Sequence, residues 1–175
     1  MKSVRVGVFL LEYCLSKEFA RKLCIMLDTG LISHQHYSRW CDEIIETFEK
    51  PPYWIIELSL KRDVHEAYNV VCEFIYSEPC IKFKDIDDLY VACLFLSYER
   101  GKITWESFLL KAGQFTDGSD SAKHECEYFY MMLNDYENSD YLKTIEENQR
   151  KEITNEFKLE IDEISRDYSI FNKYL

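Results

Sequence analysis

Glycine and proline are scarce in this chain, and their scarcity constrains the fold more than any other feature. The 175 residues include 5 Gly and 3 Pro. A protein of many short strands needs frequent turns, so few turn-forming residues favour long helices. Hydrophobic residues make up 47% of the chain, which is ordinary for a globular protein. We therefore predict an all-α fold, organised as a helical bundle.

Apolar residues recur at three- and four-residue steps through most of the chain, as they do in amphipathic helices. The clearest example spans residues 17–28, where Ser16 is a candidate N-cap and Gly30 follows the end. Further helices are predicted after Ser33, from about residue 63 to 76, from residue 85 or 87 to Gly101, after Thr104, and from about residue 122 to 136.

Two short apolar stretches are ambiguous. Residues 2–14 fit either a strand or a buried helix, so the predicted fold includes a possible short N-terminal strand. Residues 53–60 also fit an internal strand. They directly follow Pro51 and Pro52, however, and a short buried helix started by the prolines agrees better with a helical protein.

Two segments of the chain share the same residue pattern. Gly30-Leu31-Ile32-Ser33 is followed four residues later by Tyr37, and Gly101-Lys102-Ile103-Thr104 is followed four residues later by Phe108. The offset between the copies is 71 residues throughout. Each copy has the pattern of a helix, a Gly C-cap, an Ile beneath the turn and a Ser or Thr N-cap. We expect two helix-turn-helix hairpins, whether or not a duplication produced them.

From Tyr141 onward the chain shows one amphipathic pattern over about 30 residues. Its apolar stripe consists of Leu142, Ile145, Gln149, Ile153, Phe157, Ile161, Ile164, Tyr168 and Phe171. A break at residues 138–140 precedes it, with Asp140 as a candidate N-cap. We therefore predict a helical core domain over residues 1–137. Residues 138–175 are predicted to form a long acidic helix, packed on that core or on a partner.

The chain is acidic, with a net charge of −11 from 32 acidic and 21 basic residues. From Asp117 to the end there are 15 acidic and 7 basic residues, so most of the excess lies in the last third. Direct binding to nucleic acid is disfavoured, because Lys and Arg carry such binding. A basic partner, or solubility alone, explains the charge better.

The seven cysteines are dispersed, odd in number and never spaced as CxxC, which is typical of free thiols in a reducing compartment. The apolar run near the N-terminus resembles a signal peptide, but Glu12 interrupts it and no cleavage site follows. No stretch approaches the roughly 18 apolar residues of a membrane span. We predict a cytoplasmic protein that does not enter a membrane.

Motifs for catalysis are missing from the sequence. It contains no GxGxxG, GxxxxGK[ST] or GxSxG. His34 and His36 are two residues apart, so on a helix they point in different directions and cannot share a metal easily. A metal site assembled across helices, for instance from His65, His124 and Glu125, stays an alternative. Otherwise we predict no catalytic residue, no metal and no cofactor, and we do not expect an enzyme.

Carboxylates on the predicted C-terminal helix, and just before it, are the remaining functional signal. They form either a solvated helix face with internal pairs, such as Glu147 with Lys151, or a docking surface for a basic protein. Nearby exposed tyrosines, Tyr174 among them, would suit as interface anchors. The residues assigned to partner binding are Asp135, Glu137, Asp140, Glu152, Glu156, Glu160, Glu163, Asp167, Tyr136 and Tyr141.

Four segments carry a resemblance to a known family. They are residues 30–33 (GLIS) before the helix that bears Trp40, residues 51–59 (PPYWIIELS), residues 98–105 (YERGKITW) and residues 127–134 (EYFYMMLN). Together they resemble an uncharacterised bacterial family of small helical proteins associated with immunity to polymorphic or contact-dependent toxins. The resemblance covers about residues 20–137 and transfers no active-site residue. It implies a non-enzymatic role, the sequestration of a toxin domain, commonly a basic nuclease.

Three functional hypotheses follow. The first is an immunity protein that neutralises a cognate cationic toxin domain, of nuclease type, through its acidic surface. The second is a helical adaptor or oligomerisation module that uses the C-terminal amphipathic helix. The third is a metal-dependent hydrolase.

Overall fold

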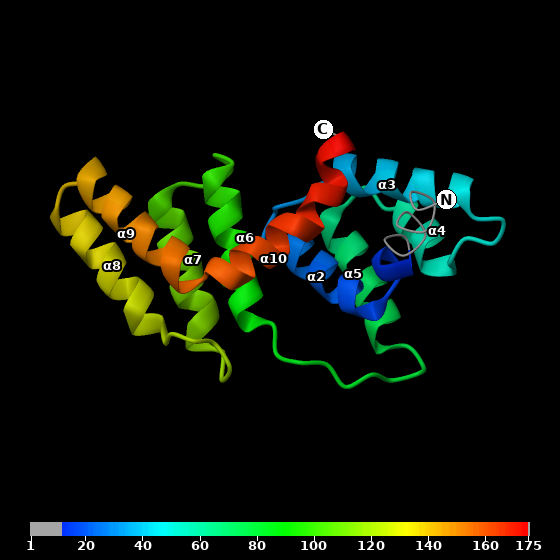
Figure 1. The fold of residues 1–175 in the computed structure, drawn as a ribbon, viewed down its shortest axis with the longest axis horizontal. Helices are drawn as coiled ribbons and strands as arrows, with labels where there is room; N and C mark the ends of the chain where they lie inside the picture. Colours follow the sequence, from blue (N-terminus) through cyan, green and yellow to red (C-terminus); the bar gives the residue numbers. More distant parts are fainter. Residues whose placement is uncertain (1–11, 175) are drawn as a thin grey trace, which may run out of the picture. The chain divides into compact units, whose positions relative to one another are not determined.

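The computed structural model describes residues 12–174, and every regular element in that range is a helix (Figure 1). The helices are α2 (Lys17–Asp28), α3 (His34–Thr47), α4 (Tyr53–Ser59), α5 (Val64–Tyr76), α6 (Asp87–Glu99), α7 (Trp105–Asp117), α8 (Cys126–Asn138), α9 (Lys143–Glu156), α10 (Lys158–Tyr168) and the 3-10 helix η1 (Ser169–Tyr174). The all-α prediction is confirmed. The possible N-terminal strand falls mostly on residues 2–11, outside the described residues. None of the described helices is long and apolar enough to span a membrane.

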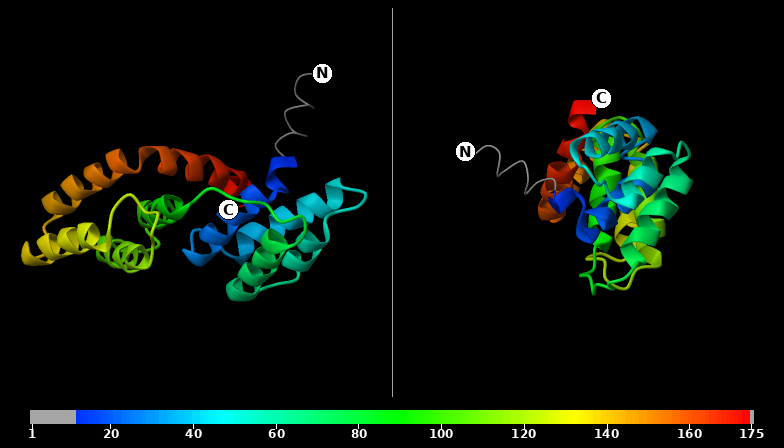
Figure 2. Two further views of the ribbon diagram at one scale, coloured as in Figure 1. Left: turned by 90° about the horizontal axis from the view of Figure 1, so that it is seen from below. Right: turned by 90° about the vertical axis from the view of Figure 1, so that its right-hand side faces the viewer.

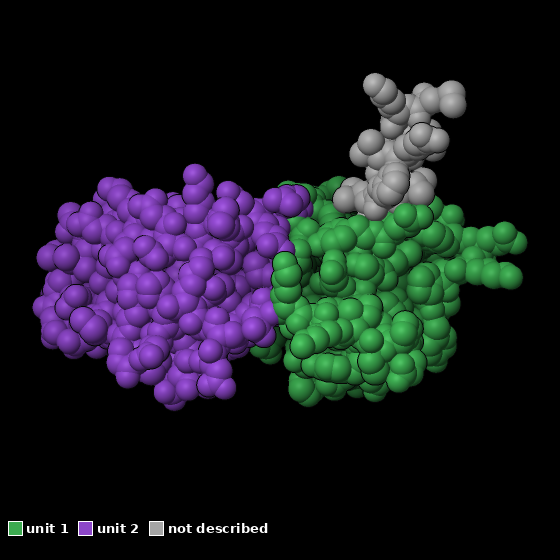
Figure 3. Space-filling model, turned by 60° about the horizontal axis from the view of Figure 1, so that its bottom comes forward, with its two compact units in different colours: residues 1–84, 167–175 green, residues 85–166 purple. Residues whose placement is uncertain are grey.

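The chain forms two compact units, coloured separately in Figure 3. Unit 1 comprises residues 1–84 and 167–175, and unit 2 comprises residues 85–166. The domain boundary expected near residue 138 therefore falls inside unit 2. The reason is that α9 packs against α8, so the acidic C-terminal segment begins as part of this helical core.

In unit 1, α2 lies beside α5, and α3 packs against α4 and η1 (Figures 1 and 2). Aromatic rings join these elements. The ring centroid of Trp40 lies 5.8 Å from that of Phe19 and 5.7 Å from that of Phe171. The guanidinium of Arg39 donates to the backbone carbonyl of Tyr174 over 3.0 Å. The C-terminal segment is thus part of the core of unit 1.

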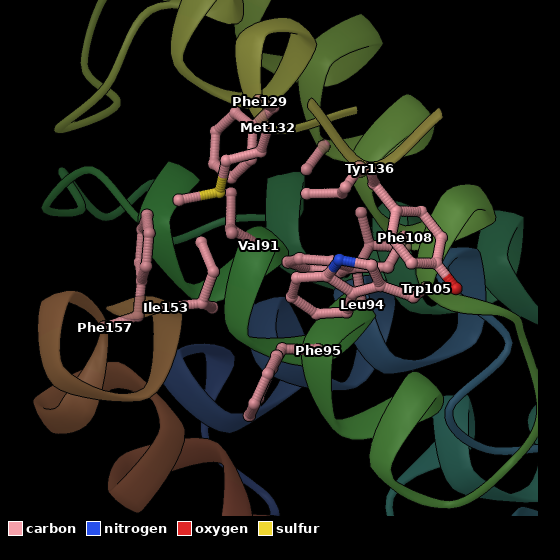
Figure 4. Packing of buried hydrophobic residues seen from close by; sticks show 12 residues of the cluster. Val91, Leu94, Phe95, Trp105, Phe108, Phe129, Met132, Tyr136, Ile153 and Phe157 are labelled. Carbon is pink, nitrogen blue, oxygen red and sulfur yellow. The ribbon is translucent and has the colours of Figure 1, made fainter. Parts of the chain in front are cut away.

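Unit 2 has its own core, to which α6, α7, α8 and α9 contribute side chains that point toward one another (Figure 4). Helices α7 and α8 approach each other closely at Gly113 of α7, where an added Cβ would lie 2.5 Å from the ring of Tyr130. The buried residues of this cluster are Val91, Leu94, Phe95, Trp105, Phe108, Leu109, Ala112, Phe129, Met132, Tyr136, Ile153 and Phe157.

Helix starts follow the local sequence signals. The hydroxyl of Ser16 accepts a hydrogen bond from the backbone N–H of Phe19 at 3.2 Å, and Thr104 does the same for Ser107 at 3.2 Å. Pro52 directly precedes α4, whose Ile55 is fully buried. The prediction of a short buried helix after the two prolines is therefore confirmed.

The two segments that share a residue pattern have the same geometry. Gly30 lies between α2 and α3 with φ of 71°, and Gly101 lies between α6 and α7 with φ of 67°. This left-handed conformation favours glycine, because a Cβ strains it. Ile32 is buried beneath the first turn and Ile103 is partly buried beneath the second. The helix-turn-helix prediction is confirmed, with one hairpin in each unit.

One helix starts later than its sequence pattern predicts. The helix expected from residue 122 begins at Cys126. The hydroxyls of Ser119 and Ser121 donate to the carboxylate of Asp87 at 2.5 and 2.6 Å, and the backbone N–H of Lys123 donates to Asp88 at 2.9 Å. These contacts hold the preceding residues in a loop, because the bonded groups are no longer free to enter a helix.

The long C-terminal helix is interrupted, contrary to the prediction of a single helix. It divides at Phe157, whose φ of −107° and ψ of 22° depart from helical values. Phe157 is buried in the core of unit 2, whereas the chain enters unit 1 at residue 167. The apolar stripe is therefore divided between two cores.

Candidate functional site

The negative charge of the protein is concentrated in unit 2. Residues 85–166 contain 19 acidic and 9 basic residues, a net charge of −10. The remaining residues, which form unit 1, contain 13 acidic and 12 basic residues, a net charge of −1. Unit 2 is therefore the part of the chain that offers an electrostatic binding surface.

Several carboxylates predicted to bind a partner already form hydrogen bonds or ion pairs with other side chains of unit 2. Glu152 accepts from the hydroxyl of Tyr128 at 3.0 Å. Glu156 lies 3.2 Å from the imidazole of His124, and Glu160 forms a 2.8 Å ion pair with Lys123. These pairs fix the loop before α8 onto α9 and α10. Glu163 is partly buried. The outer face of the C-terminal helices therefore carries much less unpartnered charge than its sequence indicates.

Two of the predicted partner-binding residues do not lie on an exposed surface. Asp167 is 5% exposed and belongs to unit 1, where it accepts from Lys22 at 2.9 Å and from the hydroxyl of Tyr13 at 3.1 Å. Tyr136 is 9% exposed, and its hydroxyl donates to Glu146 at 3.1 Å. Tyr174 is likewise buried, with its hydroxyl bonded to Glu43. These side chains are buried by residues that are distant in the chain. The local sequence pattern therefore did not predict their burial.

The other predicted residues gather at the turn between α8 and α9 (yellow and orange in Figure 1). Asp135, Glu137 and Asp140 are exposed, and Tyr141 is 50% exposed. Leu142, which is 56% exposed, joins them. The sequence assigned Leu142 to the buried stripe, but it precedes α9 and faces solvent. We name these five residues the acidic corner.

The backbone of the acidic corner is strained. Asp140 and Tyr141 have φ of 56° and 61°, and among residues 12–174 they are the two non-glycine residues with positive φ. The left-handed region costs such residues about 1–2 kcal/mol each. The N-cap position of α9 is taken by Leu142, so the prediction of Asp140 as the N-cap is wrong. Conformations of this cost often occur where side chains serve a binding function.

Hydrogen bonds define this turn as a Schellman motif. The backbone N–H of Asp140 donates to the carbonyl of Glu137 at 2.9 Å, and that of Tyr141 donates to the carbonyl of Tyr136 at 3.0 Å. The N–H of Leu142 donates to the hydroxyl of Ser139 at 3.2 Å. The backbone groups at the turn are thus satisfied locally, and the side chains of Asp140 and Leu142 are left for other contacts.

A buried network supports the acidic corner from beneath. The ring of Tyr136 meets that of Tyr141 edge to face, with centroids 5.3 Å apart. Glu146 accepts hydrogen bonds from the hydroxyls of both Tyr136 and Tyr98. Burial, and then the bond to Glu146, raise the pKa of both phenols, so they remain neutral donors at pH 7. The corner is therefore attached to a fixed part of the core.

The histidines have structural contacts where the structure describes them. His36 is buried and its Nδ1 lies 3.0 Å from the backbone N–H of Ser33. His124 stacks on Tyr128 with ring centroids 4.0 Å apart. Of the other candidate metal ligands, His65 lies on α5 in unit 1, whereas Glu125 precedes α8 in unit 2. Within residues 12–174, no group of three or more His, Cys, Asp or Glu side chains is placed to hold a metal.

A surface depression and two buried thiols are further candidates for chemistry. An open depression along α9 is lined by residues of mixed charge, and one of them, Arg150, is already paired with Glu99 at 2.6 Å. Burial raises the pKa of the Cys14 thiol to about 11 and also raises that of Cys41, which makes both thiols poor nucleophiles. The residues lining the depression are Glu147, Arg150, Lys151, Thr154 and Asn155.

Comparisons with protein-family models, with curated proteins and with solved structures gave no match to this chain. The family resemblance described above therefore rests on its four short segments. Among the chain's own residues, those of the acidic corner form the candidate binding site.

Proposed function

We propose that this protein is an immunity protein, which neutralises a cognate cationic toxin domain by binding it through the acidic corner of unit 2. The observation that carries the proposal is a strained, exposed turn with three carboxylates beside Tyr141 and Leu142. It lies in a unit of net charge −10. The four segments that resemble a toxin-immunity family support the same assignment.

The chemistry of the corner suits a basic protein surface. Its three carboxylates, Asp135, Glu137 and Asp140, have no side-chain partner within the part of the chain that the structure describes. They are therefore available to pair with Lys and Arg of a partner. Such charges speed association and select the partner's sign, while an aromatic side chain and a leucine supply the buried contact.

The mode of neutralisation follows from charge. A nuclease binds its substrate's phosphates through Lys and Arg, and the carboxylates of the corner compete for the same cations. Occupation of that surface excludes nucleic acid without any reaction by this chain. The action belongs in the cytoplasm, where the toxin would reach its substrate and where the free cysteines of this chain stay reduced.

The alternative functions have less support. An adaptor that oligomerises through the C-terminal amphipathic segment needs a free apolar stripe, but Ile153, Phe157, Ile164, Tyr168 and Phe171 are all buried by this chain itself. A metal-dependent hydrolase needs a ligand cluster, and the described residues offer none. No specific observation therefore favours either alternative over a binding role.

The test has two parts. The first is whether the reading frame beside the one for this chain encodes a large secreted protein with a cationic C-terminal domain. The second is binding of that domain to this chain, measured by calorimetry at two salt concentrations. We expect tight binding that weakens as salt rises, because exposed charges are screened. The double replacement Asp135→Lys with Glu137→Lys should weaken binding by about 100-fold or more, since each reversal turns an attraction into a repulsion.

A matched control variant distinguishes the loss of specific contacts at the acidic corner from the effect of a changed net charge. The replacements Asp120→Lys and Asp162→Lys make the same change of charge at two other exposed sites of unit 2. We expect this control to retain nearly the wild-type affinity. Equal loss in both double variants would show that the corner is not the site. Binding that is indifferent to salt and to both variants would exclude the basic-partner mechanism.

A further inference from the structure

Two cysteines from different helices meet in unit 1. Cys24 lies on α2 and Cys72 on α5, and these helices run side by side (Figures 1 and 2). Their Sγ atoms are 3.3 Å apart, although the residues are 48 positions apart in the chain. A disulfide has an S–S distance of about 2.0 Å, so the sulfurs need to approach by little more than about 1 Å.

The two thiols differ in their access to solvent. Cys24 is 6% exposed, whereas Cys72 is partly exposed. Burial, together with the neighbouring Cys72, raises the pKa of the Cys24 thiol, so Cys24 is a poor first nucleophile. An oxidant from solvent therefore reacts first at Cys72. The thiol of Cys24 also points to the backbone carbonyl of Tyr68, at 3.9 Å, which keeps it close to Cys72.

We propose that Cys24 and Cys72 are an oxidation site that forms a disulfide when a peroxide reaches Cys72. In the first step the Cys72 thiolate attacks one peroxide oxygen, the O–O bond breaks, and Cys72 becomes a sulfenic acid while hydroxide leaves. In the second step the sulfur of Cys24 attacks the sulfur of Cys72. The S–S bond forms, the S–O bond breaks, and the Cys24 proton leaves with the oxygen as water. Two thiols and one hydrogen peroxide thus give one disulfide and two waters.

The disulfide would link the first and last helices of the α2–α5 segment. Such a cross-link restricts the unfolded chain more than the folded one, because the sulfurs are already neighbours in the fold. We expect the melting temperature of the oxidised protein to rise by about 5–10 °C relative to the reduced protein. The site lies in unit 1 and is independent of the acidic corner in unit 2.

The experiment treats the purified full chain with a small excess of hydrogen peroxide, blocks the remaining thiols and digests without reduction. Mass spectrometry should find one peptide pair, joined through Cys24 and Cys72, with the loss of two hydrogen masses. The exposed Cys80 is the competitor, so the treatment is repeated on Cys80→Ser, where the linked pair should persist. Reduction with dithiothreitol should return both peptides and remove the gain in melting temperature.

The control variants are Cys72→Ser, which should lose both the linked peptide and the thermal shift, and Cys93→Ser, which should keep both. Cys93 is buried in unit 2, so it matches the chemical change without touching the pair. Sulfinic or sulfonic acid at Cys72 without a link to Cys24 would overturn the proposal. So would a cross-link that involves any other cysteine, or no oxidation at Cys72 while Cys80 reacts. The wild-type measurement decides the matter even if a variant does not fold.

Discussion

The α6–α7 turn and the α8–α9 turn of unit 2 share one hydrogen-bond pattern. They differ in the residue that occupies the left-handed position. In the first, Gly101 donates to the carbonyl of Tyr98 at 2.8 Å and Lys102 donates to that of Ser97 at 2.9 Å. In the second, Asp140 and Tyr141 make the corresponding bonds. Both are Schellman motifs, and only the first has glycine at the left-handed position.

The two turns therefore contribute differently to the protein. Gly101 adopts its conformation without a side chain to strain, and Thr104 then caps the next helix. At the other turn Asp140 and Tyr141 retain side chains at a conformational cost, and Leu142, the N-cap residue of α9, makes no side-chain cap hydrogen bond. The first turn is suited to stability. The second sacrifices some stability, and in exchange it presents a carboxylate, a phenol and a leucine to solvent.

The helices that leave the two turns are nevertheless joined in the core. The indole Nε1 of Trp105 donates to the side-chain oxygen of Gln149 at 2.9 Å, and the Gln149 nitrogen donates to the carbonyl of Met132 at 2.8 Å. Trp105 begins α7, and Gln149 lies on α9. The strained turn is therefore fixed to the stable one through a buried polar contact.

The largest expected effect comes from breaking that contact with Gln149→Leu. Leucine is similar in size, but it leaves the buried indole N–H without an acceptor, which costs about 2–3 kcal/mol of unfolding free energy. Urea denaturation followed by tryptophan fluorescence would measure the loss. Asn148→Leu, at the adjacent exposed position, should change stability by less than about 0.5 kcal/mol. Equal effects of the two variants would show that the contact does not join the helices.

Gly101→Ala tests the stable turn. A Cβ at Gly101 would meet no atom within 4 Å, so its cost is the backbone strain alone, about 1–2 kcal/mol. Gly118→Ala is the control, because Gly118 has a φ of −100° and its added Cβ meets the nearest atom at 3.9 Å. Chemical denaturation of both variants measures the difference. A neutral Gly101→Ala would mean that glycine is not what stabilises this turn.

Much of the fold was predictable because its signals are local. Ser16 and Thr104 cap helices that begin directly after them, and Gly101 ends one, since such hydrogen bonds span three to five residues. The interruption at Phe157 was not predictable. The apolar stripe continues through it, so the local pattern contains no signal for the break.

The candidate site was predictable only in part. The sequence placed Asp135, Glu137, Asp140 and Tyr141 in one segment, and the structure keeps them together. The sequence alone could not show that Asp167 pairs with Lys22, because the two residues are distant in the chain. Local patterns also do not encode a left-handed Asp140, since the usual signal for that conformation is a glycine.

Asp140→Gly makes the opposite change to Gly101→Ala, because it introduces glycine at the left-handed position of the α8–α9 turn. Glycine relieves the left-handed strain at this position, so we expect a gain of about 0.5–1 kcal/mol in unfolding free energy, measured by urea denaturation. The same variant removes a carboxylate from the acidic corner, so its affinity for a cationic partner should fall. A variant that is both less stable and equally active in binding would reverse our interpretation of this turn.

Glu146→Gln should have the smallest effect at pH 7, about 0.5 kcal/mol, because glutamine still accepts a hydrogen bond. Its effect depends on pH. The folded pKa values of Tyr98 and Tyr136 are raised, by burial first and then by Glu146, above the unfolded value of about 10. The stability linked to these neutral phenols is fully present below pH 10 and is lost as pH rises through the folded pKa values.

Above pH 10 the ionising phenols of the wild type are repelled by the Glu146 carboxylate, a repulsion that Glu146→Gln lacks. The unfolding free energies of the two proteins should therefore converge between pH 9 and about pH 11, and phenolate absorbance at 295 nm should appear at lower pH in the variant. Glu147→Gln, whose side chain is exposed, should follow the wild type at every pH. A constant difference across the range would mean that Glu146 does not control these phenols, and that the two turns are coupled through Gln149 alone.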